Sequence, residues 1–287
     1  MSARASTSTT RVGFIGLGNQ GAPMARRIVD EGYPLTIWAR RAETVEPFGD
    51  TAATVAAAPA ELGAASDIVG ICVVADADVE DVLLRPDGAL AGMTPGGIVA
   101  IHSTIHPDTC RRIADHARER GVAIVDAPVS GGGGAAAGRK LLVMAGGDEE
   151  DVDRCRPVFE TYGEPVIHLG PIGSGQMAKL LNNFVFTAQI AAALETYAFA
   201  SGLGVDRGAL AQVLANASGG SRAAAILSFT DFDLSAMRQV AAPLLRKDVG
   251  LMLDVARSEG VPEPSALVGL AQRALATLAA AGEANDS

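Results

Sequence analysis

The chain has 287 residues, of which 48% are hydrophobic and 20% charged, a composition typical of a globular protein of about two domains and not of a disordered or coiled-coil chain. Its 33 acidic residues outnumber the 23 Lys and Arg residues, giving a formal charge of −10. A net anion is repelled by nucleic acid and by acidic membranes, so neither is expected as a partner. Three cysteines without CxxC spacing argue against a disulfide framework or a zinc ribbon and favour the cytoplasm.

Residues 1–10 contain several Ser and Thr and lack the apolar core of a secretory signal, so a disordered tail is predicted there. The longest apolar stretch free of charge runs between Lys179 and Glu195. It is shorter than the roughly 18 residues that a membrane-spanning helix needs. No membrane segment is therefore expected.

From Arg11 to about Gly170, short apolar runs alternate with amphipathic stretches, a pattern that predicts βαβ units around a parallel sheet. Strands are predicted at Val12–Ile15, Leu35–Trp38, Ile68–Val74, Gly97–Ile101, Ala123–Asp126, Leu141–Ala145 and Val166–His168. Helices are predicted at Ala22–Glu31, Val79–Leu84, Pro107–Arg120 and Glu149–Tyr162. The first domain, over residues 11–172, is therefore expected to be of the α/β class.

The segment Gly16-Leu17-Gly18-Asn19-Gln20-Gly21 lies between the first predicted strand and the first predicted helix. In such a turn the first glycine allows the tight bend, the second lets the backbone approach a pyrophosphate, and the third lets helix and strand pack closely. The helix N-terminus then faces the phosphates. The motif predicts a dinucleotide cofactor on a doubly wound Rossmann sheet, and the alternative is a turn with a structural role only.

The residues after the second strand bear on the choice of cofactor. An acid there would bind the ribose 2′-hydroxyl of NAD, whereas an arginine accommodates the 2′-phosphate of NADP. Here Arg40 and Arg41 follow the strand, and no acid occurs before Glu43. NADP(H) is favoured and NAD(H) remains possible, because a guanidinium matches a phosphate with two parallel hydrogen bonds. The alternative is that both arginines are solvated loop charges.

Two histidines and a glycine run follow. His102 and His106 are four residues apart, a spacing that could bring two metal ligands onto one helix face. Pro107 disfavours helix at His106, so no metal site is predicted. Instead, His106 is expected to precede a helix that has proline at its first position. The segment from Asp126 to Gly134 is a strand end followed by four glycines. Its backbone N–H groups and one hydroxyl could form a concave site for a carboxylate, and the alternative is a flexible loop.

After Pro171 the pattern changes. Residues 176–202 carry no turn signal and no β-run, which predicts a helix of about 40 Å at about 1.5 Å per residue. The remainder reads as further helices, so an all-α C-terminal domain is predicted over residues 173–287. The long helix is apolar on nearly all sides, so it should be buried by its own domain or by another subunit, and a homo-oligomer is expected.

Lys179 and Asn183 are four residues apart and share one face of this helix. Among apolar neighbours the pKa of a lysine is pushed down, which suits it to move protons near neutrality. Lysines near a helix start are usually solvated, but the pair Asn182 and Asn183 on a buried helix needs partners. Lys179 is therefore a candidate acid and base for hydride-transfer chemistry.

Together these segments resemble the β-hydroxyacid dehydrogenase family, which contains 3-hydroxyisobutyrate dehydrogenase, tartronate semialdehyde reductase and the glyoxylate/succinic semialdehyde reductases. The resemblance covers nearly the whole folded chain. The motifs that carry it are, in order, Gly16-Leu17-Gly18-x-x-Gly21-x-Pro23-Met24-Ala25, Asp126-Ala127-Pro128-Val129-Ser130-Gly131-Gly132, Gly173-x-Gly175-x-x-x-Lys179-x-x-Asn182-Asn183 and Lys247-Asp248.

The resemblance implies an oxidoreductase that exchanges hydride between NADP(H) or NAD(H) and a small 3-hydroxy acid or semialdehyde, assembled as a homodimer or homotetramer. It makes Lys179 the proton donor and acceptor and Asn183 a substrate-orienting amide. The other implied contacts are the substrate carboxylate with Ser130, Gly131 and Gly132, the nicotinamide half with Val73, Val74 and Thr104, and cofactor or substrate with Lys247.

Three other functions are weighed against this one. Asn182 stands where 6-phosphogluconate dehydrogenases have histidine, which argues against that substrate. Imine reductases share the fold but usually replace the lysine, so Lys179 favours a C–O over a C=N substrate. A non-catalytic sensor or scaffold that binds a dinucleotide is the remaining alternative, and the pair of Lys179 and Asn183 argues against it.

Overall fold

The computed structural model describes residues 9–280, and the chain divides after Lys179 into two compact units. Most of the tail expected over residues 1–10, and the end of the chain after residue 280, lie outside the described residues. The strands of the first unit are β1 (Val12–Ile15), β2 (Leu35–Trp38), β3 (Thr54–Val55), β4 (Ile68–Ile71), β5 (Ile98–Ile101), β6 (Ala123–Asp126), β7 (Val129–Ser130), β8 (Leu141–Ala145) and β9 (Gly163–His168).

The helices of this unit connect those strands. They are α1 (Gly21–Asp30), α2 (Pro59–Ala64), α3 (Asp76–Leu84), α4 (Ala89–Gly92), α5 (Pro107–Arg118), α6 (Gly132–Ala137) and α7 (Glu149–Phe159), with short 3₁₀ turns η1 (Ala42–Thr44) and η2 (Glu46–Phe48). The long helix α8 (Ser174–Gly202) follows β9 and continues into the second unit.

Six strands form a parallel sheet in the order β3-β2-β1-β4-β5-β6. The order reverses at β1, the first strand of the chain, which pairs with β2 on one side and with β4 on the other. This is the doubly wound Rossmann arrangement, in which a crevice opens at the carboxyl ends of the strands where the order reverses. The predicted fold class is therefore confirmed.

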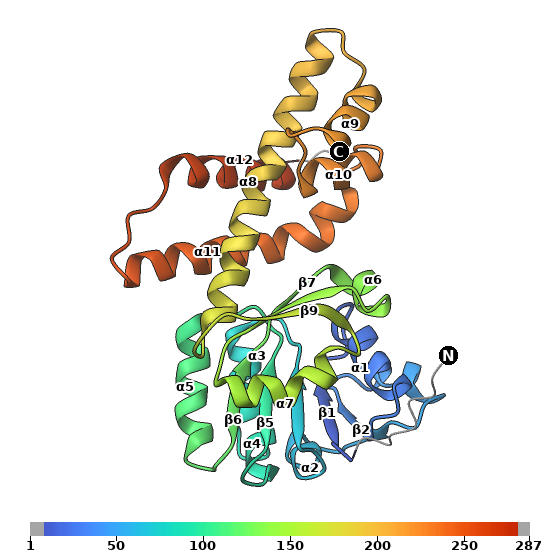
Figure 1. The fold of residues 1–287 in the computed structure, drawn as a ribbon, viewed down its shortest axis with the longest axis vertical. Helices are drawn as coiled ribbons and strands as arrows, with labels where there is room; N and C mark the ends of the chain where they lie inside the picture. The colour runs from blue at the N-terminus through green and yellow to red at the C-terminus, as the bar shows by residue number, and fades with distance from the viewer. Residues whose placement is uncertain (1–8, 281–287) are drawn as a thin grey trace. The chain divides into compact units, whose positions relative to one another are not determined.

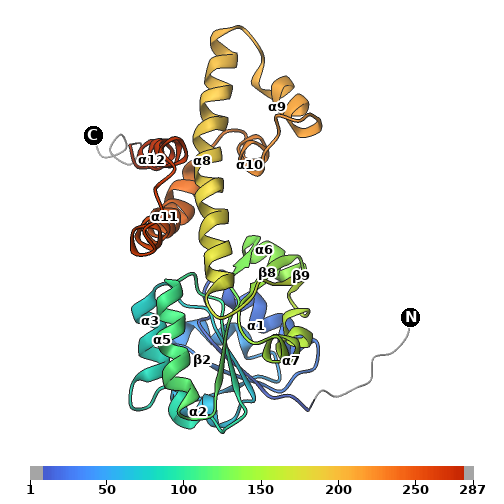
Figure 2. The same cartoon turned by 60° about the vertical axis from the view of Figure 1, so that its left-hand side comes forward.

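Both faces of the large sheet are covered by helices (Figures 1 and 2). Along β1, Val12 and Phe14 point into a core with α1 and α7, whereas Ile15 points into a second core with α2 to α5. Neighbouring strands alternate in the same way. Because both faces are buried, these strands are continuous apolar runs with no polar alternation.

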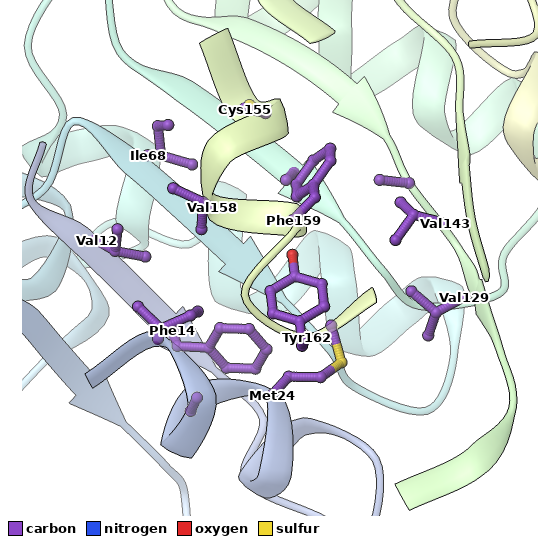
Figure 3. Packing of buried hydrophobic residues seen from close by; sticks show 14 of the residues in the cluster. Val12, Phe14, Met24, Ile68, Val129, Val143, Cys155, Val158, Phe159 and Tyr162 are labelled. Carbon is purple, nitrogen blue, oxygen red and sulfur yellow. The ribbon is translucent and has the colours of Figure 1, made fainter. Parts of the chain in front are cut away.

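Figure 3 shows the first of these cores around Tyr162, which is fully buried with Phe14, Met24 and Phe159. The Tyr162 hydroxyl lies 3.1 Å from Nε2 of His102. Nδ1 of His102 lies 2.7 Å from the carbonyl oxygen of Ala127. Both ring nitrogens of this buried histidine therefore have partners, and burial lowers its pKa to about 4.

The last three strands form a separate sheet in the order β7-β8-β9. The pair of β7 and β8 is antiparallel, and the pair of β8 and β9 is parallel. The prediction that all strands join one parallel sheet was wrong here, because Val129–Ser130 turns the chain back on β8 directly after β6. The glycine run is not a loop throughout, since α6 begins within it at Gly132.

The second unit is helical throughout its described part. After α8 it contains α9 (Arg207–Asn216), α10 (Arg222–Phe229), the π-helical turn η3 (Met237–Ala241), α11 (Ala242–Ser258) and α12 (Ser265–Ala279). Ser221 and Asp206 cap α10 and α9 with side-chain hydrogen bonds to backbone N–H groups. Within residues 9–280, none of the helices has both the length and the hydropathy that crossing a membrane requires.

The long helix α8 begins two residues before the predicted start and ends at the predicted Gly202. It is not buried on all sides of this chain. Leu180, Phe184 and Ile190 are fully or almost fully buried, whereas Leu181 is 47% and Phe199 70% exposed.

Candidate functional site

The glycine turn lies at the carboxyl end of β1, where the sheet order reverses. Gly16 has a φ of +99°, and a Cβ atom there would lie 2.2 Å from the carbonyl oxygen of Cys72. A Cβ atom on Gly21 would lie 1.9 Å from the carbonyl oxygen of Gly16. These two glycines are required by the backbone geometry itself.

Gly18 is different, because it is exposed and a Cβ atom there would meet no protein atom within 4 Å. Nothing in the folded chain requires glycine at this position. A ligand that approaches the backbone closely does require it, and the middle glycine of this turn has that role toward a pyrophosphate. The residues present therefore fit a dinucleotide.

Next to the turn lies a cavity of about 390 Å³. Seven residues predicted to bind the cofactor line it, namely Gly16, Leu17, Gly18, Arg40, Arg41, Val73 and Val74. The strand predicted to run to Val74 ends at Ile71, so Val73 and Val74 lie in the segment between β4 and α3. Asn19, Gln20, Gly21 and Thr104 do not line the cavity.

Both arginines that line this cavity have acidic partners. Nη2 of Arg40 lies 2.5 Å from Oδ1 of Asp78, in the first turn of α3. Nε of Arg41 lies 3.7 Å from Oε1 of Glu43, and both of those side chains are mostly exposed. The residues after β2 pointed to the arginines, but nothing in the sequence pointed to Asp78.

The predicted carboxylate-binding segment lies against the glycine turn. Ser130 ends β7, Gly131 precedes α6 with a φ of +138°, and Gly132 begins α6 with a φ of +78°. A Cβ atom on Gly133 would lie 2.4 Å from the carbonyl oxygen of Asn19. The glycines thus let α6 pack onto the turn, while Gly131 and Gly132 stay exposed.

The start of α8 is held by the last residue of β6. The carboxylate oxygens of Asp126 accept hydrogen bonds from the backbone N–H groups of Gly173 at 2.6 Å and Gln176 at 2.7 Å. Asp126 is fully buried. Burial raises the pKa of its carboxyl group, and the hydrogen bonds from Gly173 and Gln176 act in the opposite direction.

The Gln176 side chain joins α8 to the end of β5. Its Nε2 donates to the carbonyl oxygen of Ser103 at 2.8 Å, and its Oε1 accepts from the N–H group of Ile105 at 3.1 Å. Thr104 lies between these two partners. The hydroxyl oxygen of Ser103 in turn accepts from the N–H group of Val73 at 2.8 Å. Gln176 was not among the predicted site residues, and its only signal in the sequence is a polar residue at the start of an apolar helix.

Lys179 lies on α8 one turn after Gln176 and is half-buried. The same helix carries Asn183, which belongs to the second unit. Nδ2 of Asn183 lies 2.5 Å from Oδ2 of Asp248, and Nζ of Lys247 lies 2.8 Å from Oδ1 of the same carboxylate. Asp248 therefore joins two of the predicted site residues inside the second unit.

Of the remaining polar candidates, His106 caps a helix and Cys72 lines the cavity. His106 precedes α5, which has Pro107 at its first position as predicted, and Nδ1 of His106 accepts from the N–H group of Asp108. Cys72 is half-buried beside the turn, and Cys110 and Cys155 are buried. In the part of the chain that the structure describes, no group of three His, Cys, Asp or Glu side chains is arranged to hold a metal ion.

A glycine turn of this kind at the reversal point of a parallel sheet is typical of the dinucleotide-binding class of Rossmann proteins. Residues 11–170 match the family model for the NAD binding domain of 6-phosphogluconate dehydrogenase. Residues 173–287 match the model for the NAD-binding region of NADP-dependent 3-hydroxyisobutyrate dehydrogenase.

Two known proteins are similar to this chain over about nine-tenths of its length or more. The NAD-dependent L-serine dehydrogenase of Pseudomonas aeruginosa is 34% identical over 91% of this chain and 90% of its own. A solved structure of 3-hydroxyisobutyrate dehydrogenase from Mycobacterium tuberculosis with L-serine is 30% identical, covers 94% of both chains and has a TM-score of 0.83. The chain belongs to the β-hydroxyacid dehydrogenase family and is an NAD(P)-dependent dehydrogenase.

An imine reductase from Pseudomonas sp. is a more distant neighbour. Its structure is 20% identical over 96% of both chains, with a TM-score of 0.62. At this identity the likeness concerns the fold alone.

Proposed function

We propose that the protein interconverts a small 3-hydroxy acid and the corresponding semialdehyde, with residues 11–172 binding the cofactor and residues 173–287 serving substrate binding and oligomerisation. The names of the relatives support this substrate class. L-serine and 3-hydroxyisobutyrate, which two of them are named for, both carry a hydroxyl group on the carbon next but one to a carboxylate. A carboxylate anchor and a proton-transfer group are what such a substrate needs.

The observation that carries the proposal is the connection between the glycine turn and the start of α8. Val73 lines the cavity and bonds to Ser103, and Ser103 bonds to Gln176, one turn before Lys179. The start of α8, which carries Lys179 one turn after Gln176, is therefore tied by hydrogen bonds to a segment that lines the cavity in the same unit.

In the proposed reaction the nicotinamide supplies or accepts the hydride. The Lys179 ammonium donates a proton to the carbonyl oxygen in reduction, and the neutral amine takes the hydroxyl proton in oxidation. The Ser130 hydroxyl and the N–H groups of Gly131 and Gly132 hold the substrate carboxylate.

Two residues of the second unit complete the proposed set. Asn183 orients the substrate through its amide, and Lys247 contacts cofactor or substrate. Asp248 contacts both side chains, since it accepts a hydrogen bond from Asn183 and pairs with Lys247.

We propose NADP(H) as the preferred cofactor, with NAD(H) also accepted. Arg40 and Arg41 on the cavity wall support binding of a 2′-phosphate. Asn19, Gln20, Gly21, Val74 and Thr104 complete the proposed cofactor contacts.

We further propose a homodimer or homotetramer that works in the cytoplasm. Several large apolar side chains of the second unit are exposed in the single chain, among them Phe229 at 92%, Phe199 at 70% and Leu203 at 65%. Apolar side chains exposed to this degree are typical of surfaces that a subunit covers. Sedimentation of the purified protein measures the subunit number.

The test of the reaction is a steady-state screen with NADPH and NADH. In reduction the substrates are glyoxylate, succinic semialdehyde, tartronate semialdehyde and methylmalonate semialdehyde. In oxidation they are L-serine and 3-hydroxyisobutyrate. Turnover of a cyclic imine and of none of these acids would assign the chain to imine reduction, and cofactor binding without any turnover would leave a sensor or scaffold.

The test of the proton donor is Lys179→Ala. Loss of the ammonium group is expected to lower kcat by about 10²–10⁴, the usual share of general acid–base catalysis, while the Kd for NADPH stays within a few-fold. Lys140→Ala is the matched control, because Lys140 is an exposed lysine of the same unit that does not line the cavity. Wild-type kcat in Lys179→Ala would remove this residue from the mechanism.

A further inference from the structure

Arg40 is not an isolated cation on the cavity wall, because a carboxylate already occupies one of its nitrogens. Nη2 of Arg40 lies 2.5 Å from Oδ1 of Asp78. The Arg40 side chain is 55% exposed, whereas that of Asp78 is 24% exposed. The acid is therefore the more firmly enclosed member of the pair.

A second contact fixes Asp78 independently of Arg40. Its other oxygen, Oδ2, accepts a hydrogen bond from the backbone N–H group of Ala75 at 3.2 Å, and its own N–H group donates to the Ala75 carbonyl oxygen at 3.1 Å. This reciprocal arrangement caps the first turn of α3. Asp78 thus keeps a backbone partner when its side chain does not pair with Arg40.

Each of the two arginines that line the cavity is paired with one acidic side chain. Arg40 pairs with Asp78, and Arg41 pairs with Glu43. A 2′-phosphate brings an additional charge of about −1.5 to −2. It binds a guanidinium most strongly through two parallel hydrogen bonds, and Asp78 holds one of the nitrogens that such a contact uses. A 2′-hydroxyl is neutral and does not compete for Arg40.

We propose that Asp78 is a specificity-determining residue for the cofactor, which weakens binding of NADP(H) by holding Arg40 and leaves binding of NAD(H) unchanged. The inference rests on the proposed function, in that it takes this cavity as the nicotinamide cofactor site and Arg40 as the partner of the 2′-phosphate. On this proposal, the Asp78 carboxylate and the 2′-phosphate compete for the Arg40 guanidinium, and this competition sets the preference for NADP(H) or NAD(H).

The test is direct binding of NADPH and NADH, measured by fluorescence titration at low ionic strength, where charge effects are largest. The variant is Asp78→Asn, which removes the charge and keeps an amide oxygen to accept from Ala75. Asp78→Asn is expected to lower the Kd for NADPH about tenfold, the effect of removing one charge at contact range. The Kd for NADH is expected to stay within twofold.

Two further variants separate a specific effect from a general one. Glu43→Gln removes an equal charge from a longer and more exposed pair, so its effect on NADPH should stay below threefold. Arg40→Gln removes the residue through which Asp78 acts, so adding Asp78→Asn to it should leave the Kd for NADPH unchanged.

The outcomes are distinct. An NADPH Kd in Asp78→Asn within twofold of the wild type, or weaker, overturns the inference, and so does an effect that persists in the Arg40→Gln background. Such results leave the proposed function intact, since the wild-type protein still binds its cofactor. A wild-type protein that binds neither NADPH nor NADH refutes the proposed function and this inference together.

Discussion

Gly18 and Gly21 belong to the same turn, but replacing each with alanine should affect different properties. At Gly18 a Cβ atom meets no protein atom within 4 Å, and the residue does not have the positive φ that disfavours other residues. Alanine there removes backbone freedom from the unfolded chain. We expect Gly18→Ala to change the free energy of unfolding by between 0 and about +1 kcal/mol.

At Gly21 the new Cβ atom would lie 1.9 Å from the carbonyl oxygen of Gly16 and 3.1 Å from the Phe14 ring. The nearest atom is backbone, so the first turn of α1 must move away from the end of β1. Overpacking of this kind usually costs about 1–3 kcal/mol, and we expect a value near the upper end. At about 2–4 °C per kcal/mol for a chain of this size, Gly21→Ala should lower Tm by roughly 6–12 °C.

Gly18→Ala, which should hardly change stability, should nevertheless weaken cofactor binding. The added methyl group of Gly18→Ala occupies the space through which the backbone approaches a pyrophosphate, so we expect the Kd for NADPH to rise at least about tenfold. The assays are thermal unfolding without cofactor and fluorescence titration with NADPH. A Gly18→Ala variant with wild-type Kd, or a Gly21→Ala variant with wild-type Tm, would refute the reasoning.

Two further predictions concern the framework behind the site. Burial lowers the pKa of His102 to about 4 from an unfolded value near 6.5, so the unfolded state binds a proton that the folded state does not. Stability is therefore lost as pH falls from 6.5 toward 4, by about 2 kcal/mol between pH 7 and 5. Urea unfolding at pH 7 and pH 5 should show a smaller loss of stability in His102→Gln than in the wild type. An equal pH dependence in both proteins would contradict this prediction. Gln176→Met leaves the buried carbonyl of Ser103 and N–H of Ile105 unpaired, which should reduce the free energy of unfolding by about 2–4 kcal/mol and lower kcat more than the affinity for NADPH. An unchanged urea midpoint and kcat would show that Gln176 does not carry these contacts.

The strands of the large sheet could be predicted closely because each is an apolar run buried on both faces. Val12–Ile15, Leu35–Trp38 and Ala123–Asp126 have the predicted bounds in the structure. Thr54–Val55 could not be found in this way, since it has only two residues and both are exposed. The helix Gly132–Ala137 contains three glycines, which local helix propensity disfavours.

For the site, the sequence indicated what lies in the glycine turn and after β2, because those residues are local to one βαβ unit. It did not indicate which residues hold the start of α8. Asp126 and Gln176 are 50 residues apart, and Gln176 bonds to Ser103 across 73 residues. Such pairs depend on how the strands are ordered in the sheet, and a single sequence has no period or spacing that reveals it.

The hydrogen bonds of Asp126 with Gly173 and Gln176 fix the start of α8 to the first unit. This attachment bears on how the enzyme can change over evolution. Lys179 is the last residue of the unit that contains the glycine turn, although most of its helix belongs to the other unit. The proposed proton donor and the glycine turn therefore belong to the same compact unit. An exchange of the helices beyond Lys179 with those of a relative should then alter which substrate side chain is accepted, provided that Asn183, Lys247 and Asp248 are kept, and should leave the glycine turn and Lys179 unchanged.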